Sequence, residues 1–161
     1  MNAFFMRRVF LSLAVALAVL LGTYGTAFAV TNGTPDGNKH PYVGLLIFTD
    51  GQSYWRCSGS LLSPTVVLTA GHCTEGATQA WVTFDTHVER GTLPIADFLA
   101  SGPFITGTAY TDPNFCIGCG HGLVRFDTFD VGVVVLDQPA DVNKFAQLPD
   151  AGLVDTLDMW T

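Results

Sequence analysis

The nine residues TVVLTAGHC, Thr65–Cys73, run from a β-branched apolar segment directly into a histidine and a cysteine. Valine and threonine favour extended backbone, and Pro64 interrupts any earlier strand because proline has no amide hydrogen to give to a sheet ladder. The segment therefore predicts a strand over residues 65–69 that ends just before His72. An imidazole at a strand end raises the question of which group it faces.

Extended runs of the same kind lie on both sides of this strand, and turn residues separate them. The pair Asp50-Gly51, for example, indicates a tight reversal after the first run. No long segment with helical periodicity lies between the runs, and one turn after Cys73 is the only helical candidate outside the N-terminal segment. The pattern predicts an all-β fold, an antiparallel barrel or sandwich. The six runs cover residues 42–48, 54–62, 65–69, 79–84, 104–109 and 131–136.

The N-terminal segment, residues 1–29, has the layout of a secretory signal peptide. An arginine pair precedes an apolar stretch over residues 9–21, and Ala27-Phe28-Ala29 fits a small-x-small cleavage site. Cleavage there leaves Val30 as the new N-terminus of a secreted, extracellular protein. The alternative is an uncleaved membrane anchor, since the apolar stretch extended to Val30 is just long enough to span a bilayer.

The charge balance restricts the classes of partner. The sequence has seven Lys and Arg residues against 14 Asp and Glu, and two of the seven basic residues lie in the predicted signal, which leaves the mature chain at a formal charge of −9. A surface this acidic repels phosphate backbones and anionic lipid, so we expect neither a nucleic-acid partner nor a membrane-surface partner. The four cysteines of an exported chain are expected to form disulfides.

Two adjacent motifs carry a resemblance to a known family. The segment CSGSLL, Cys57–Leu62, followed by VVLTAGHC at residues 66–73, resembles the histidine box of the trypsin/chymotrypsin-like serine peptidases. The resemblance implies a disulfide between Cys57 and Cys73, and it implies that His72 is the general base of a Ser-His-Asp triad that hydrolyses polypeptides. It also implies a six-stranded antiparallel β-barrel, the first of the family's two barrels. A purely structural histidine is the alternative.

A triad also needs a carboxylate that holds the second nitrogen of the imidazole. Residues 130–136, DVGVVVL, resemble the family segment that supplies it, which implies that Asp130 is the triad aspartate. A carboxylate that opens a nearly all-apolar strand is costly to bury alone and needs a hydrogen-bonding partner, and His72 would be one. Asp127 is the nearest competitor, but no comparable apolar run follows it, so we expect a solvated loop carboxylate there. The separation of His72 from Asp130 is long for the family and predicts enlarged loops.

The predicted mature start, VTNG at residues 30–33, resembles the start of the active peptidases, where a new α-amino group inserts as an ammonium and orders the active site. Asn32 stands where the family has a glycine. The aspartate that receives the ammonium lies beside the family's serine, in a segment that this sequence does not contain.

The nucleophile is the main departure from the family pattern. The family's serine follows the aspartate within Gly-Asp-Ser-Gly-Gly, and neither a serine nor a cysteine follows Asp130 here. Ser101 precedes Asp130 and reads as part of a turn. We therefore expect the N-terminal portion of a trypsin-like serine endopeptidase, inactive alone, with the barrel in residues 30–147, the start of the connector in residues 148–161, and the second barrel supplied in cis or in trans. The alternatives are a secreted non-catalytic binding module and one half of a split peptidase.

The remaining cysteines, Cys116 and Cys119, form a Cys-x-x-Cys motif that could be bridged, metal-binding or redox-active. Surrounding glycines and a proline predict a loop, whereas a thioredoxin-like motif begins a helix. A zinc site would need Asp112 or Asp127 as a further ligand, and structural zinc prefers sulfur and nitrogen. We expect a local disulfide that stiffens an enlarged loop, with a metal site or free thiols as alternatives, and we expect no cofactor and no catalytic metal.

Overall fold

The fold comes from a computed structural model that describes residues 34, 36–120 and 127–157. The predicted signal peptide, residues 1–29, and the predicted mature N-terminus, Val30, lie outside these described residues. Within the described part of the chain, no helix is both long enough and apolar enough to cross a membrane.

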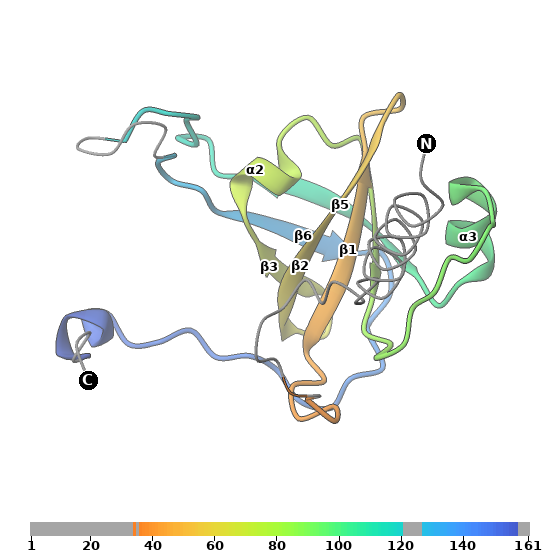
Figure 1. Ribbon diagram of the computed structural model, residues 1–161. Coiled ribbons are helices and arrows are strands. Elements are labelled where there is room, and N and C mark those ends of the chain that lie inside the picture. The colour runs from red at the N-terminus through yellow and green to blue at the C-terminus, as the bar shows by residue number, and fades with distance from the viewer. Residues whose placement is uncertain (1–33, 35, 121–126, 158–161) are drawn as a thin grey trace, which may run out of the picture. The chain divides into compact units, whose positions relative to one another are not determined.

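Six strands close into one antiparallel barrel in the order β1-β2-β3-β6-β5-β4 (Figure 1). The predicted six-stranded all-β fold is therefore confirmed, and every predicted run corresponds to one strand. Closure leaves no unpaired strand edge in the barrel. The strands are β1 (Val43–Thr49), β2 (Tyr54–Ser63), β3 (Val66–Thr69), β4 (Gln79–Thr83), β5 (Ile105–Thr111) and β6 (Gly132–Leu136).

The barrel interior is filled by alternate strand residues. Leu46 and Phe48 of β1 point inward and have no solvent exposure, because successive side chains of a strand face opposite sides. The other strands contribute residues of the same type to this core, including Leu61, Val67, Val82 and Val134. The inward-facing apolar residues of the strands thus form the core of the barrel.

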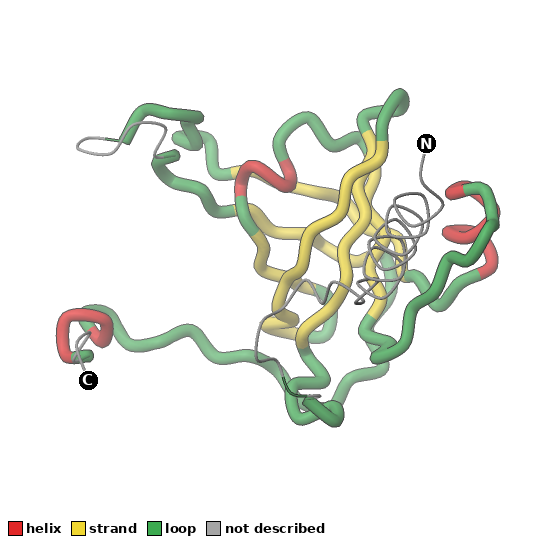
Figure 2. Tube along the Cα trace, in the orientation of Figure 1, coloured by secondary structure: helices red, strands yellow, loops and turns green. Residues whose placement is uncertain are grey.

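The outer face of β1 is apolar as well, and a short helix covers it. Helix α3 (Ile95–Ser101) lies outside the barrel (Figure 2). It buries Phe98 and Leu99 against Ile47, and these residues form a second apolar cluster. The sequence did not predict this helix, because seven residues between Pro94 and Gly102 are too few to show a helical period. The single turn expected near Cys73 is present as α2 (Gly71–Thr74).

Two segments differ in detail from their predicted form. Ser101, expected in a turn, is the last residue of α3, and its hydroxyl donates a hydrogen bond to the carbonyl of Asp97 at 2.7 Å. Strand β6 begins at Gly132, so Asp130 precedes the strand instead of opening it. The barrel is followed by a 3-10 turn, η1 (Leu153–Thr156), inside the range predicted to begin a connector.

Gly132 lies at a close approach between β6 and α2, and we predict that it tolerates no side chain. A Cβ there would clash with Thr74 Oγ1 and lie 2.8 Å from Thr74 Cγ2 and 2.9 Å from the carbonyl oxygen of Ala70. We expect Gly132→Ala to lower the free energy of unfolding by about 1–3 kcal/mol, measured by urea denaturation. Val135→Thr, at an exposed position of the same strand, is the control and should change little. Equal stability of the two variants would contradict this packing.

Candidate active site

The backbone around His72 is held from two sides. Strand β3 ends at Thr69, and the single turn α2 then carries His72 beside Cys73, which is buried and bonded to Cys57 of β2. The indole Nε1 of Trp55 donates a hydrogen bond to the Cys73 carbonyl at 2.8 Å. The disulfide implied by the family resemblance is thus present, and it ties α2, the turn that carries His72, to strand β2.

Gly71 brings the same turn against the segment that leads into β6. A Cβ at Gly71 would lie 3.1 Å from the ring of Phe115 and 3.1 Å from the amide nitrogen of Val131, so a larger residue would push the turn away. Thr74 adds a hydroxyl hydrogen bond to Thr111 of β5 at 2.8 Å. These contacts fix the distance between α2 and the residues around position 130.

The carboxylate of Asp130 meets His72 through both of its oxygens. Oδ2 lies 2.8 Å from the ring Nδ1, and Oδ1 accepts a hydrogen bond from the His72 backbone amide, also at 2.8 Å. An ionised carboxylate only accepts hydrogen bonds, so Nδ1 carries the hydrogen and Nε2 presents a lone pair. The side chains are 55% exposed for His72 and 30% exposed for Asp130, which leaves the imidazole open to an incoming group.

The electrostatics of the pair keep Asp130 ionised. Partial burial by itself raises the pKa of the Asp130 carboxyl, but the hydrogen bonds from the His72 amide and ring, the electrostatic attraction of that ring and the Gly71 amide together hold that pKa below its ordinary value of 3.8. A carboxylate with this pKa keeps the imidazole in one tautomer at neutral pH.

This lowered pKa predicts a dependence of stability on acid pH. Because the folded-state pKa of Asp130 lies below the unfolded-state value, the stability it contributes is complete above the ordinary value of 3.8 and is lost as the pH falls through the lower folded-state value. We expect wild type to be more stable than Asp130→Asn at about pH 6, and the difference to shrink as the pH is lowered below 3.8, by denaturant unfolding at each pH. A difference that stays constant over this range would contradict the prediction.

Asp127, the competing carboxylate, faces a different group. Its Oδ1 accepts a hydrogen bond from the amide of Gly118 at 2.7 Å, inside the loop closed by a disulfide between Cys116 and Cys119. The backbone of Cys116 pairs with Thr128 through two hydrogen bonds of 3.1 Å. Both cysteines of the Cys-x-x-Cys motif are therefore bonded to each other, and the loop they close is attached to the chain just ahead of Asp130.

One cluster of metal-binding residue types lies at the site. Atoms of Cys57, His72 and Cys73 lie within 4.8 Å of one another, but the two sulfurs form the disulfide and are not available as ligands. Within the described residues, this cluster offers a metal only the imidazole of His72.

The sequence missed two contacts that position the pair. Asp130 accepts the His72 backbone amide in addition to facing the imidazole, and the ring of Phe115 packs on Gly71. The glycine before the histidine was the available signal, because a residue without a side chain at a strand end often marks a close approach of another segment.

A shallow depression of about 440 Å³ lies beside the carboxylate. Apolar side chains of Val43 and Val131 line it together with the small residues Ser58, Gly59 and Ser60 of β2. Val43 and Val131 are both about half exposed, at 48% each. The described residues therefore leave an open, partly apolar surface next to the His72–Asp130 pair.

A family model and sequence relatives show which known proteins this chain resembles. A family model described as Trypsin matches residues 30–151. A chymotrypsin of Phaedon cochleariae is 43% identical over 108 residues, which cover 67% of this chain and 35% of that protein. A protein of Phytophthora infestans called glucanase inhibitor protein 2 is 30% identical over 106 residues, which cover 66% of this chain and 36% of that protein.

Among solved structures, HL collagenase is similar with a TM-score of 0.49 at 20% identity, over 69% of this chain and 43% of that chain. The chain spans about a third of the length of the curated relatives named above.

Proposed function

Because this chain belongs to the trypsin family, we propose that it contributes the general base and the orienting carboxylate of a serine endopeptidase. In this proposal His72 is the base and Asp130 is the carboxylate. The nucleophilic serine and the oxyanion-hole amides come from a second barrel, either in the same polypeptide or in a partner. The substrates are polypeptides.

The proposed chemistry uses the lone pair on Nε2 of His72. As the serine hydroxyl attacks a peptide carbonyl, Nε2 takes its proton, and the tetrahedral intermediate then collapses to an acyl-enzyme while His72 returns the proton to the leaving amine. Water repeats the sequence and releases the acid product. Asp130 remains ionised throughout, holds the hydrogen on Nδ1 and stabilises the imidazolium that forms in each step.

One observation carries the proposal, namely the two contacts of 2.8 Å between Asp130 and His72. A histidine with a purely structural role needs only one partner for its ring. Here the carboxylate also holds the backbone of the same residue, so both the position and the tautomer of the imidazole are defined while Nε2 stays free of any partner within the described residues. This is the arrangement that a general base requires.

The proposal is tested by completing the enzyme. The full chain is fused to the serine-bearing second barrel of a trypsin-family relative, and folding is checked by circular dichroism and by the absence of free thiols. We expect a fluorophosphonate probe to label the serine of the fusion. A folded fusion that the probe labels equally well with and without the His72 imidazole would contradict the proposal.

A non-catalytic binding function is the second candidate, and one relative favours it, since its name describes an inhibitor of glucanase. In that case the chain acts through its surface and needs no serine. The test is inhibition of a secreted glucanase by the unmodified full chain. Inhibition that persists in His72→Ala would support the binding module, and its absence would leave that candidate without support.

We also propose that the mature protein is secreted after loss of residues 1–29, with a barrel domain over residues 30–147 and the start of a connector over residues 148–161. The two disulfides suit an oxidising compartment. We predict that N-terminal sequencing of the exported protein reads Val-Thr-Asn-Gly from Val30. Replacing Ala29 with arginine should block this cleavage. An exported protein that still begins at Met1 would instead support the membrane anchor.

A further inference from the structure

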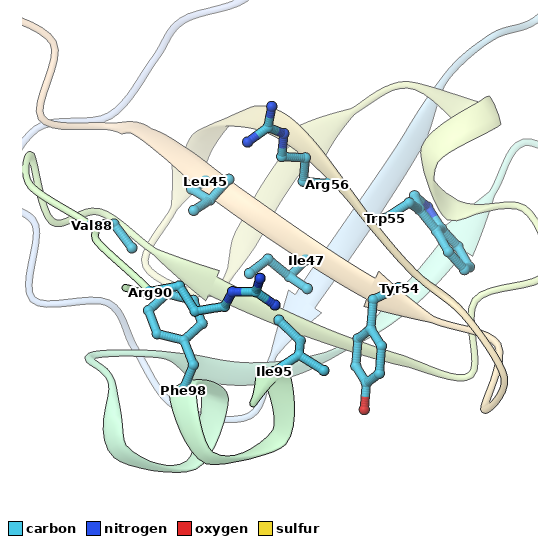
Figure 3. A pocket seen from close by; sticks show the side chains of 9 residues that line it. All are labelled: Leu45, Ile47, Tyr54, Trp55, Arg56, Val88, Arg90, Ile95 and Phe98. Carbon is cyan, nitrogen blue, oxygen red and sulfur yellow. The ribbon is translucent and has the colours of Figure 1, made fainter. Parts of the chain in front are cut away.

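A groove of about 670 Å³ lies on the outside of the barrel, between β2 and the segment of residues 88–98 that contains the start of α3 (Figure 3). Its volume is within the range of sites that hold small molecules or peptide side chains. Nothing in the proposed peptidase chemistry uses this groove.

The strand register explains how the groove is built. Leu45 and Ile47 of β1 face outward, because the intervening Leu46 faces the barrel core. Ile47 pairs directly with Arg56 of β2, so Arg56 stands on the same outer face. Figure 3 shows Leu45 and Ile47 as the floor, with Arg56 on one side and with Arg90 and Phe98 on the other. The groove therefore has an apolar floor and one arginine from each of its two walls.

The groove carries positive charge although the protein as a whole is acidic. The chain has a net charge of −7, and the described residues contain four Lys and Arg side chains, of which two, Arg56 and Arg90, line this groove. Ion pairs within the described part of the chain involve His40, His72 and His87 and neither of these arginines. No described side chain therefore pairs with either guanidinium, and both can donate hydrogen bonds to an anion from outside.

We propose that the groove binds an acidic polypeptide segment in which carboxylate side chains flank an apolar one. The planar guanidinium binds a carboxylate through two parallel hydrogen bonds, and the two arginines come from separate walls. A ligand that uses both must carry two anionic groups with an apolar body between them. Glutamate or aspartate on either side of a phenylalanine or leucine has this form, with the apolar side chain over Leu45 and Ile47.

The groove is joined to the turn that carries His72. Trp55 lies at the edge of the groove with its ring turned toward the barrel core, where it packs on Phe48, and its indole nitrogen donates to the carbonyl of Cys73, the residue that follows His72. Arg56 directly precedes Cys57 of the disulfide. A peptide bound in the groove therefore lies beside the strand that supports the candidate active site, although its binding does not depend on the catalytic role of His72.

The experiment measures binding of the peptide Glu-Phe-Glu-Leu-Glu to the full chain by fluorescence anisotropy. The peptide carries fluorescein at its N-terminus and is amidated at its C-terminus. We expect Arg56→Gln and Arg90→Gln each to weaken binding by about tenfold, since each removes a charge-assisted pair. Lys39→Gln is the matched control because it removes one positive charge away from the groove, and it should bind as wild type does. His72→Ala should also bind as wild type does, which separates this proposal from the peptidase proposal.

Three outcomes would overturn the proposal. The first is no binding of the peptide to wild type, in which case the arginines serve to cover the apolar floor with their aliphatic stems. The second is an equal loss of binding in Lys39→Gln, which would show attraction to net charge alone. The third is displacement by decanoate together with full binding of a Gln-Phe-Gln-Leu-Gln peptide, which would assign the groove to small amphipathic molecules.

Discussion

Replacing His72 with alanine in the completed fusion enzyme is expected to lower kcat by about four to six orders of magnitude, measured with a chromogenic peptide substrate. The physical reason is that the serine hydroxyl then has no group within reach to take its proton. Asp130→Asn should also cause a loss of about four orders of magnitude, because an amide facing Nδ1 no longer selects the tautomer with a free Nε2. KM should change far less than kcat in both variants.

Two controls make this result specific. His87→Ala removes an exposed imidazole that lies 3.3 Å from the carboxylate of Glu89, and it should leave kcat unchanged. The double variant His72→Ala with Asp130→Asn should be no slower than His72→Ala alone, because the two residues act as one unit. A fusion that keeps most of its activity without His72 would remove the basis of the proposed mechanism.

Phe48→Ala is expected to have the largest effect on stability, a loss of about 3–5 kcal/mol in the free energy of unfolding. Phe48 is fully buried in the barrel, with its ring 6.0 Å from that of Trp55, so truncation leaves a cavity that the closed barrel cannot fill. Chemical denaturation followed by far-ultraviolet circular dichroism measures the loss.

The matched control is Phe129→Ala, which removes the same atoms from a side chain that is 61% exposed. It should cost less than about 1 kcal/mol, as most exposed substitutions do. If both variants lost the same free energy, the assignment of the barrel interior would be wrong. A selective loss in Phe48→Ala would also predict weaker positioning of His72, because Trp55 packs on Phe48 and donates to Cys73.

Local patterns in the sequence were sufficient for the six strands, and the family resemblance supplied the barrel and the pairing of His72 with Asp130. The apolar, β-branched runs and the turn residues between them predict all six strands, because strand preference and turn chemistry depend mainly on neighbouring residues. His72 and Asp130 were assigned by motif, and the hydrogen bonds of 2.8 Å between them show that the fold brings the two residues together.

Only the tertiary structure decided the features that depend on contact between segments distant in the sequence. Helix α3 exists because the outer face of β1 needs covering, and seven residues carry no helical period of their own. Arg56 and Arg90 share a groove because the register places Arg56 beside Ile47 and the segment before α3 folds over the same strand. Register and packing of this kind arise from the energy of the whole fold, so no local stretch of sequence encodes them.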